Sequence, residues 1–389
     1  MNIGIVTSHA SFKNNYGAVL QCYAMCEQLK RWGITPHVIN YAYTSLNGEI
    51  DISNSNHHTF ISRIKYILSS DVNLIAKVQY RINRKHRKLL EGKFVNFYQN
   101  YIPLTPKTSI TYDELKKNGL GFDGYITGSD QVWNPLIHGN KNDPCCFLQF
   151  AEPGTKRIAY APSFGISFLP NYCKESLMHY INTFNSVSVR EISGQKILHD
   201  IVDEEFPVVL DPTLMADPDI YDQICEKNKS LPEHYILCYR FGKMKYFDVV
   251  LKKISRKMNV PVIELPLSIE AYAKGTRKDY SIGPAEFIGA IKGADLILTD
   301  SFHCTVFSIL NKKPFYSFLR QNKSDKNSMN GRIEDLLQTL KLENRLIRSL
   351  EDFEKTSVSL NMDYSYAYEI IDEKRKASQT FLKNALFNK

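Results

Sequence analysis

Apolar segments of strand length and of helix length alternate along the chain. Residues 2–8 form a short apolar run, a polar loop follows as far as Asn15, and residues 18–32 repeat apolar positions at helical spacing. Gly33 ends this predicted helix, and the next apolar run covers residues 37–41. A strand, a helix and a second strand in this order predict the start of a doubly wound parallel sheet.

Two sets of predicted strands follow one another, with a proline-rich segment at 208–221 between them. The first set continues at 124–127, 157–161 and 186–189, and the second set lies at 235–239, 260–265 and 295–299. The proline-rich segment is the best candidate for a boundary. We therefore expect an α/β protein with two Rossmann-like domains that face each other across a cleft, at residues 1–215 and 216–389.

The first of these domains carries a predicted helical insertion at residues 60–100, which is amphipathic and basic. A run of like charge on a helix is most often a solvated face. It can also attract the anionic lipids of a membrane surface. We favour the solvated face and keep the lipid alternative open. The basic side chains concerned are Arg81, Arg84, Lys85, Arg87 and Lys88.

The composition argues against two broad classes of protein. Of 389 residues, 43% are hydrophobic and 23% are charged, which is ordinary for a folded domain and unlike a disordered chain. No apolar run approaches the roughly 18 residues that a membrane-spanning helix needs. The first residues have the pattern of a strand and not of a signal peptide. We therefore expect a cytoplasmic protein, with any membrane contact peripheral and at the inner face.

The net charge and the cysteine content indicate which partners, disulfides and metal sites to expect. A net charge of +8 is most simply a solvated positive surface, and anionic small molecules or an anionic membrane surface are the next interpretation. No recognisable motif for reading DNA or RNA accompanies this charge, so we expect no nucleic-acid partner. The eight cysteines include no CxxC pair, and no cluster of His and Cys has the spacing of zinc ligands. We therefore expect neither a disulfide scaffold nor a metal site.

Candidate binding residues of the first domain follow its strands, because ligands of open α/β sheets bind at the carboxyl ends of the strands. Asn15, Tyr16 and Gly17 precede a predicted helix, so they either cap it or bind an anion or a sugar hydroxyl. Gln131 and Trp133 lie in the segment TGSDQVWNP, where an aromatic face beside polar groups suits a sugar. The alternative for this segment is a capped helix with an ordinary core tryptophan.

Charged residues follow further strands of both domains. Arg190 and Glu191 lie at the end of the strand at 186–189, where an interdomain ion pair is the simpler interpretation. Arg240 follows the strand at 235–239. In LTDSFHCTVFSIL, Asp300 or Ser301 would cap a helix that holds His303 in its first turn. A phosphate bound by the amides of that turn could be met by His303 acting as an acid.

Six segments occur in an order that resembles the polysaccharide pyruvyl transferase family, between residue 3 and about residue 318. They are NYGAVLQ, TGSDQVWNP, RIAYAPSFG, SVREISGQKIL, VLDPTL and TDSFHCTVFSIL. The resemblance implies two Rossmann-like domains arranged like a GT-B glycosyltransferase. It also implies transfer of a pyruvyl group from phosphoenolpyruvate to two hydroxyls of one sugar, which gives a cyclic ketal. The acceptor would belong to a bacterial capsule or exopolysaccharide precursor, in some families linked to a polyprenyl diphosphate.

The resemblance also suggests roles for individual residues. His303 matches the expected acid at phosphoenolpyruvate, whereas Ser301 stands where the family often has an arginine. Arg240 resembles the family's other cleft arginine, and Arg190 or Arg332 would supply the missing charge. The second domain would bind the donor, and the first the acceptor. The pocket between the halves would be positively biased.

A carboxylate, Asp130 or Glu191, would orient or deprotonate the attacking hydroxyl. Since every step is a proton transfer or the stabilisation of a charge, we expect no metal and no cofactor besides phosphoenolpyruvate as co-substrate.

Two alternatives remain at this point. The same architecture can host a glycosyltransferase that uses a nucleotide sugar, because one fold supports many chemistries. The other alternative is a diverged, non-catalytic family member that binds glycan or membrane. It is suggested by Ser301, which stands where the family often has an arginine.

Overall fold

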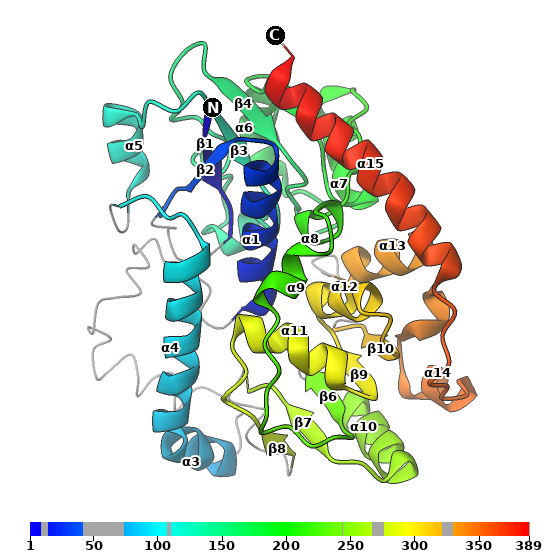
Figure 1. Cartoon of the computed structure of the whole chain (residues 1–389). Helices are drawn as coiled ribbons and strands as arrows, with labels where there is room; N and C mark the ends of the chain where they lie inside the picture. Colours follow the sequence, from blue (N-terminus) through cyan, green and yellow to red (C-terminus); the bar gives the residue numbers. More distant parts are fainter. Residues whose placement is uncertain are drawn as a thin grey trace.

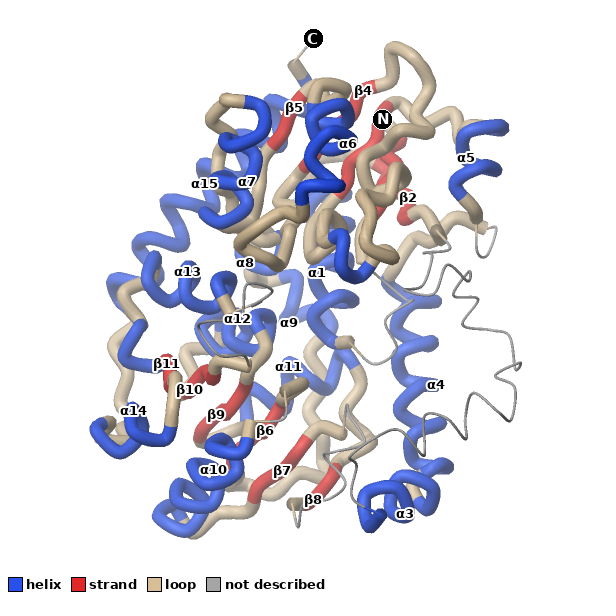
Figure 2. Tube along the Cα trace, turned by 180° about the vertical axis from the view of Figure 1, so that it is seen from behind, coloured by secondary structure: helices blue, strands red, loops and turns tan. Residues whose placement is uncertain are grey.

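The computed structural model describes residues 1–8, 15–41, 74–106, 110–242, 244–266, 276–320 and 330–388. It contains two parallel sheets, each covered by helices, stacked one above the other in Figure 1 and seen from behind in Figure 2. The α/β class with two Rossmann-like units is therefore confirmed. Parts of the predicted first loop and residues 60–73 of the insertion lie outside the described residues.

The first sheet has five parallel strands in the order β2-β1-β3-β4-β5. They are β1 Asn2–Val6, β2 Thr35–Val38, β3 Gly124–Thr127, β4 Lys156–Ala159 and β5 Ser186–Val187. The helices around this sheet are α1 Tyr16–Arg31, α5 Tyr112–Asn118, α6 Asn171–Ile181, α7 Ile192–Val202 and α8 Pro212–Met215, with a short 3-10 turn η1 at Pro135–Ile137. The chain crosses from one side of β1 to the other between β2 and β3, so the carboxyl ends of β1 and β3 flank a topological switch point.

The second sheet has six parallel strands in the order β11-β10-β9-β6-β7-β8. They are β6 Ile236–Tyr239, β7 Val262–Glu264, β8 Arg277–Lys278, β9 Leu296–Thr299, β10 Phe315–Phe318 and β11 Leu346–Ile347. Its helices are α9 Ile220–Ile224, α10 Lys245–Met258, α11 Pro284–Gly293, α12 Phe302–Leu310, α13 Gly331–Thr339 and α14 Leu350–Lys355, and the 3-10 turn η3 is Glu343–Arg345. The switch point of this sheet lies between β6 and β9.

The helical insertion is confirmed where the structure describes it, as α3 Leu74–Ile82 and α4 Arg84–Tyr101. One face of α4 is buried, and Phe94 on that face packs against Tyr16 with ring centroids 5.0 Å apart. Lys93 forms an ion pair with Glu286 of α11. The insertion therefore packs against both domains, on α1 of the first and α11 of the second (Figure 1).

The last helix, α15 Ser365–Phe387, returns from the second domain to the first (Figure 1). Its Ser378 hydroxyl accepts a hydrogen bond from the backbone N–H of Leu210 at 2.9 Å. Near its end, Lys156 of β4 donates to the carbonyl oxygen of Leu386 at 2.9 Å. Although its residues follow the second sheet in sequence, this helix covers the first one. Among the described helices, none is long and apolar enough to cross a membrane.

Candidate functional site

A buried carboxylate where the two domains meet organises the candidate site. Asp211 begins α8, and its Oδ1 accepts hydrogen bonds from the backbone N–H and the hydroxyl of Thr213 at 3.0 and 2.6 Å. Its Oδ2 accepts from Ser129 Oγ at 2.9 Å and from Arg190 Nη1 at 2.8 Å. Burial raises the pKa of Asp211, but the neighbouring His303 and Arg190 outweigh this effect and hold that pKa far below its usual range. The carboxylate is therefore ionised and fixed in place.

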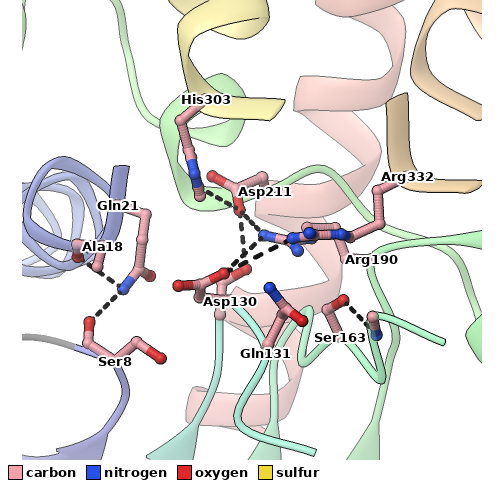
Figure 3. Close-up of polar contacts among 12 residues, drawn as sticks. Ser8, Ala18, Gln21, Asp130, Gln131, Ser163, Arg190, Asp211, His303 and Arg332 are labelled. Carbon is pink, nitrogen blue, oxygen red and sulfur yellow. Dashed lines mark hydrogen bonds and ion pairs between the residues drawn. The ribbon is translucent and has the colours of Figure 1, made fainter. Parts of the chain in front are cut away.

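His303 reaches the same carboxylate from the second domain. It lies in the first turn of α12, which Ser301 caps by accepting from the N–H of Cys304 at 3.4 Å. Nε2 of His303 lies 3.5 Å from Oδ2 of Asp211 (Figure 3). The ring also abuts the first turn of α1, because a Cβ added to Gly17 would lie 2.2 Å from Nδ1. The glycine at this position therefore gives the histidine room between the domains.

Two arginines from different domains lie beside this pair. Arg190 follows β5 and Arg332 belongs to the first turn of α13, and Nη1 of each lies 3.9 Å from Oδ1 of Asp130. The Arg190 guanidinium also lies over the ring of Phe302 at 4.6 Å, and its Nε is 3.4 Å from Oε2 of Glu191. Burial, reinforced by the charge of Arg190, lowers the pKa of Arg332 to about 10. Both guanidiniums are therefore charged at neutral pH.

The loop after β3 supplies polar groups on the side of the first domain. Asp130 adopts a left-handed backbone with φ of 62°, and its carbonyl oxygen accepts from the N–H of Ser163 at 2.8 Å. The Gln131 amide is satisfied when its oxygen faces Arg332 and accepts from Nη1 and Nη2 at 3.3 and 3.1 Å. This loop therefore connects the first domain to the arginine of the second (Figure 3).

A cavity of about 60 Å³ borders the cluster and is lined by both arginines, Asp211 and apolar side chains of α13. Nη2 of Arg190 and Nε of Arg332 are buried and donate to no group among the described residues. An anion in the cavity could use both donors. The expectation of a positively biased pocket is nevertheless wrong for the described cluster, because Asp130, Glu191 and Asp211 match the two arginines and His303 in number.

A match to one protein family shows to which family the chain belongs. The family model described as polysaccharide pyruvyl transferase matches residues 15–322, which is most of the chain. The chain belongs to this family. Membership implies that the protein is a transferase. Among curated proteins, none matches the chain significantly.

Solved structures agree with the architecture of this pyruvyl transferase family member. The UDP-GlcNAc 2-epimerase of Methanocaldococcus jannaschii is 15% identical with a TM-score of 0.50, over 98% of this chain and 100% of that one. The enzyme of the same name from Rickettsia bellii is 9% identical with a TM-score of 0.50, over 100% and 96%. MurG of Acinetobacter baumannii, at 9% identity, covers 99% of both chains with a TM-score of 0.40. The two epimerases, each with a TM-score of 0.50, support a GT-B-like arrangement of the two domains, and at these identities the likeness concerns the fold alone.

Arg240 lies outside the cluster, which corrects the expectation that it is the second cleft arginine of the family. Its Nη2 lies 2.8 Å from Glu264, and its Nη1 lies 2.6 Å from Asp248. The guanidinium also lies 4.7 Å above the ring of Phe247 on α10. The side chain is turned toward β7 and α10, so its charge is already neutralised away from His303.

Two aromatic candidates for acceptor binding are core residues instead. Trp133 is 1% exposed, stacks on Phe147 at 4.9 Å and offers no free face to a sugar. Tyr16 is fully buried, stacks on Phe287 at 4.5 Å and donates to the carbonyl oxygen of Ile282 at 2.6 Å, which joins the two domains. The interpretation of Trp133 as a core residue is therefore confirmed, as is the cap that Asn15 forms on α1, whereas the core position of Tyr16 was not predicted.

The sequence analysis gave no role to two residues that the structure places at the site. Asp211 lies in the VLDPTL segment, where an acid after an apolar run and before proline is a signal for a capped turn at a strand end. Arg320 directly follows the apolar run FYSFL, which no predicted strand included. It lies 3.3 Å from Asp300 and contributes to lowering the pKa of Arg332, so it is a third cation at this face of the second domain.

Proposed function

We propose that this family member transfers a pyruvyl group from phosphoenolpyruvate to two hydroxyls of one sugar in a surface-polysaccharide precursor, forming a cyclic ketal. One observation carries the proposal: Arg190, Arg332 and His303 converge from separate elements on the domain junction, and both arginines line one cavity. Phosphoenolpyruvate bears a phosphate and a carboxylate, and planar guanidiniums bind both groups in a fixed geometry.

In this proposal the free donors of Arg190 and Arg332 bind the anionic donor in place of the missing arginine at Ser301. Their ion pairs with Asp130 are long, at 3.9 Å, so an incoming phosphate or carboxylate competes with them easily. Asp211 remains paired to Arg190 at 2.8 Å and holds that guanidinium in orientation. Arg320 adds positive charge at the same end of the second domain.

His303 is the proposed acid. As an imidazolium it gives a proton to the methylene carbon of phosphoenolpyruvate, and positive charge develops at the neighbouring carbon. A sugar hydroxyl attacks that carbon and passes its proton to Asp130. The carbon–oxygen bond to phosphate then breaks, and phosphate leaves with the electron pair and the proton from Asp130. A second hydroxyl closes the ketal and returns a proton to His303, so the chemistry calls for no cofactor.

The acceptor is proposed to enter from the first domain, where Asp130 and Gln131 offer polar groups to sugar hydroxyls. Glu191 is the alternative base, because its Oε1 is buried and makes no hydrogen bond among the described residues. Asp130 is the better placed of the two, since the loop that carries it already contacts both arginines.

We further propose that the protein meets its acceptor, in polyprenyl-diphosphate-linked form, at an anionic membrane surface. In α3 and α4, Ile82 is 72% exposed and Leu89 is 65% exposed, and both lie among exposed basic side chains. Aliphatic groups beside cations suit the headgroup region of an anionic bilayer. The exposed cations are Arg81, Arg84, Lys85 and Lys88.

Vesicle flotation tests the membrane proposal. The protein should float with vesicles of phosphatidylglycerol and phosphatidylcholine, and replacement of those four cations by glutamine should leave it at the bottom of the gradient. The matched control replaces four exposed lysines of the first domain, Lys116, Lys117, Lys174 and Lys196. Equal losses in both variants would contradict a specific surface.

Titration with phosphoenolpyruvate tests the main proposal. We expect saturable binding to the wild-type protein that is lost in Arg190→Lys and Arg332→Lys and kept in Arg240→Lys. Phosphate release should then require a glycan acceptor. A rise in melting temperature with a UDP- or GDP-sugar, together with no response to phosphoenolpyruvate, would overturn the proposal in favour of a glycosyltransferase.

A further inference from the structure

A second cluster of reactive side chains lies beneath the loop that carries Asp130. His138, Asp143 and Cys146 are buried, and one ligand atom of each lies within 4.8 Å of the others. Nε2 of His138 and Sγ of Cys146 are 3.9 Å apart. Imidazole, carboxylate and thiol groups meet here beside the hydroxyl of Tyr41, and no lysine or arginine of the described residues forms an ion pair with Asp143.

The surroundings of the cluster orient its members. Both oxygens of Asp143 accept from the hydroxyl of Tyr41 at 3.0 Å, and Oδ1 also accepts from the N–H of Cys145 at 3.0 Å. The backbone of Val132 hydrogen-bonds the imidazole of His138. In metal sites, hydrogen bonds of this kind to carboxylate and imidazole ligands fix the ligand orientation and the imidazole tautomer.

We infer that His138, Asp143 and Cys146 form a structural site for a divalent metal ion of the zinc type. Thiolate, imidazole and carboxylate are the ligands that zinc takes in proteins. A dication with one thiolate, one carboxylate and a neutral imidazole has no net charge, which suits a buried site. Binding breaks the S–H bond of Cys146, forms a metal–sulfur bond and releases one proton to solvent.

This metal site would stabilise the loop after β3 that carries Asp130. The carbonyl oxygen of Cys146 accepts from Thr127 Oγ1 at 2.7 Å and from Trp133 Nε1 at 3.1 Å. Thr127 and Trp133 flank the turn that holds Asp130. A metal bound through Cys146 would therefore fix both sides of that turn, without taking part in the proposed pyruvyl transfer.

Metal analysis of the full chain, purified from zinc-supplemented medium without chelator, tests this inference. We expect about one zinc ion per chain and a thiolate-to-metal charge-transfer band after cobalt substitution. Cys146→Ala and His138→Gln should lose both signals. Cys238→Ala, which removes a buried cysteine of the second domain, should keep them.

Chelation of the wild-type protein covers the case in which those variants fail to fold. Removal of zinc should lower the unfolding temperature, and zinc but not magnesium should restore it. Zinc-free protein with an unfolding temperature insensitive to added zinc would overturn the inference, as would full zinc content in a folded Cys146→Ala variant. None of these measurements uses phosphoenolpyruvate, so their outcome is independent of the proposed function.

Discussion

Arg190 and Arg240 both follow a strand, both are buried, and both contact carboxylates, yet they differ in which of their N–H donors stay free for a ligand. Arg240 is held by Glu264 and Asp248 at 2.6–2.9 Å, and Lys278 completes the neutralisation of Glu264 at 2.9 Å. Arg190 makes one tight pair, with Asp211, and keeps a buried donor that lines a cavity. A position at a strand end therefore does not identify a binding arginine, and the cavity beside Arg190 is what makes it the better candidate.

The sharpest test of this contrast is Arg190→Lys. A lysine keeps the charge but replaces the planar guanidinium by a single ammonium nitrogen, which must serve both Asp211 and the substrate. Turnover of phosphoenolpyruvate should fall by about 10³-fold, as is typical when a charge-stabilising donor is lost from an active site. Phosphate release measures this effect, and unchanged turnover would exclude Arg190 from the donor site.

His303→Gln should have the next largest effect. Glutamine can still hydrogen-bond Asp211 but cannot deliver a proton to carbon, and removal of an acid costs about 10²-fold or more in turnover. Phosphoenolpyruvate should still bind, because the arginines are intact, and calorimetry would separate binding from turnover. Near-normal turnover would remove His303 from the chemistry.

Asp211→Asn tests the ion pair that holds the guanidinium of Arg190 in place. The pKa of Asp211 is lowered in the folded protein, so its ionised form stabilises the fold above its usual pKa of about 4 and loses this contribution as the pH falls further. The variant should be less stable than wild type at pH 7, and the difference should shrink toward pH 2. Denaturant unfolding at several pH values measures both. A difference that stays constant across this range would contradict the ion pair.

Arg240→Gln should have the smallest effect on turnover and a clear effect on stability. It leaves Glu264 buried with only Lys278 as a cation, and breaking a buried pair costs about 3 kcal/mol or more. Urea unfolding should show this loss while the affinity for phosphoenolpyruvate stays within a few-fold of wild type. A selective loss of affinity would reverse the contrast between the two arginines.

Much of the fold followed from periodicity, because apolar strands and amphipathic helices differ in their repeat. The strand at 124–127 was predicted to the residue, since Gly124 and the turn after Thr127 limit it at both ends. Strands β8 and β11 have two residues each and lie in polar sequence, so no apolar run marks them, and the apolar run of β10 at 315–318 was also missed. The return of α15 to the first sheet depends on contacts with Leu210 and Lys156, which no local pattern encodes.

The candidate site was only partly predictable. His303 and Arg190 could be found because each lies shortly after a strand, His303 in the first turn of α12 and Arg190 just before the first turn of α7. Arg240 satisfied the same rule, and only the positions of Glu264 and Asp248 show where its side chain turns. Trp133 was ambiguous because an aromatic ring near polar residues is equally suited to a sugar or a core. The cluster at His138 was missed because one of its three members is a carboxylate and the spacing of His138, Asp143 and Cys146 matches no common pattern of zinc ligands.

Because His303 of the second domain contacts Gly17 of the first, the position of the proposed proton donor depends on both halves of the molecule. One side of the imidazole lies against the start of α1, while Nε2 faces Asp211, so a rotation of the halves apart separates the acid from its counterion. Under the proposed function, an enol phosphate bound to one half alone would meet no assembled acid. Its protonation would therefore require the two halves to be in contact.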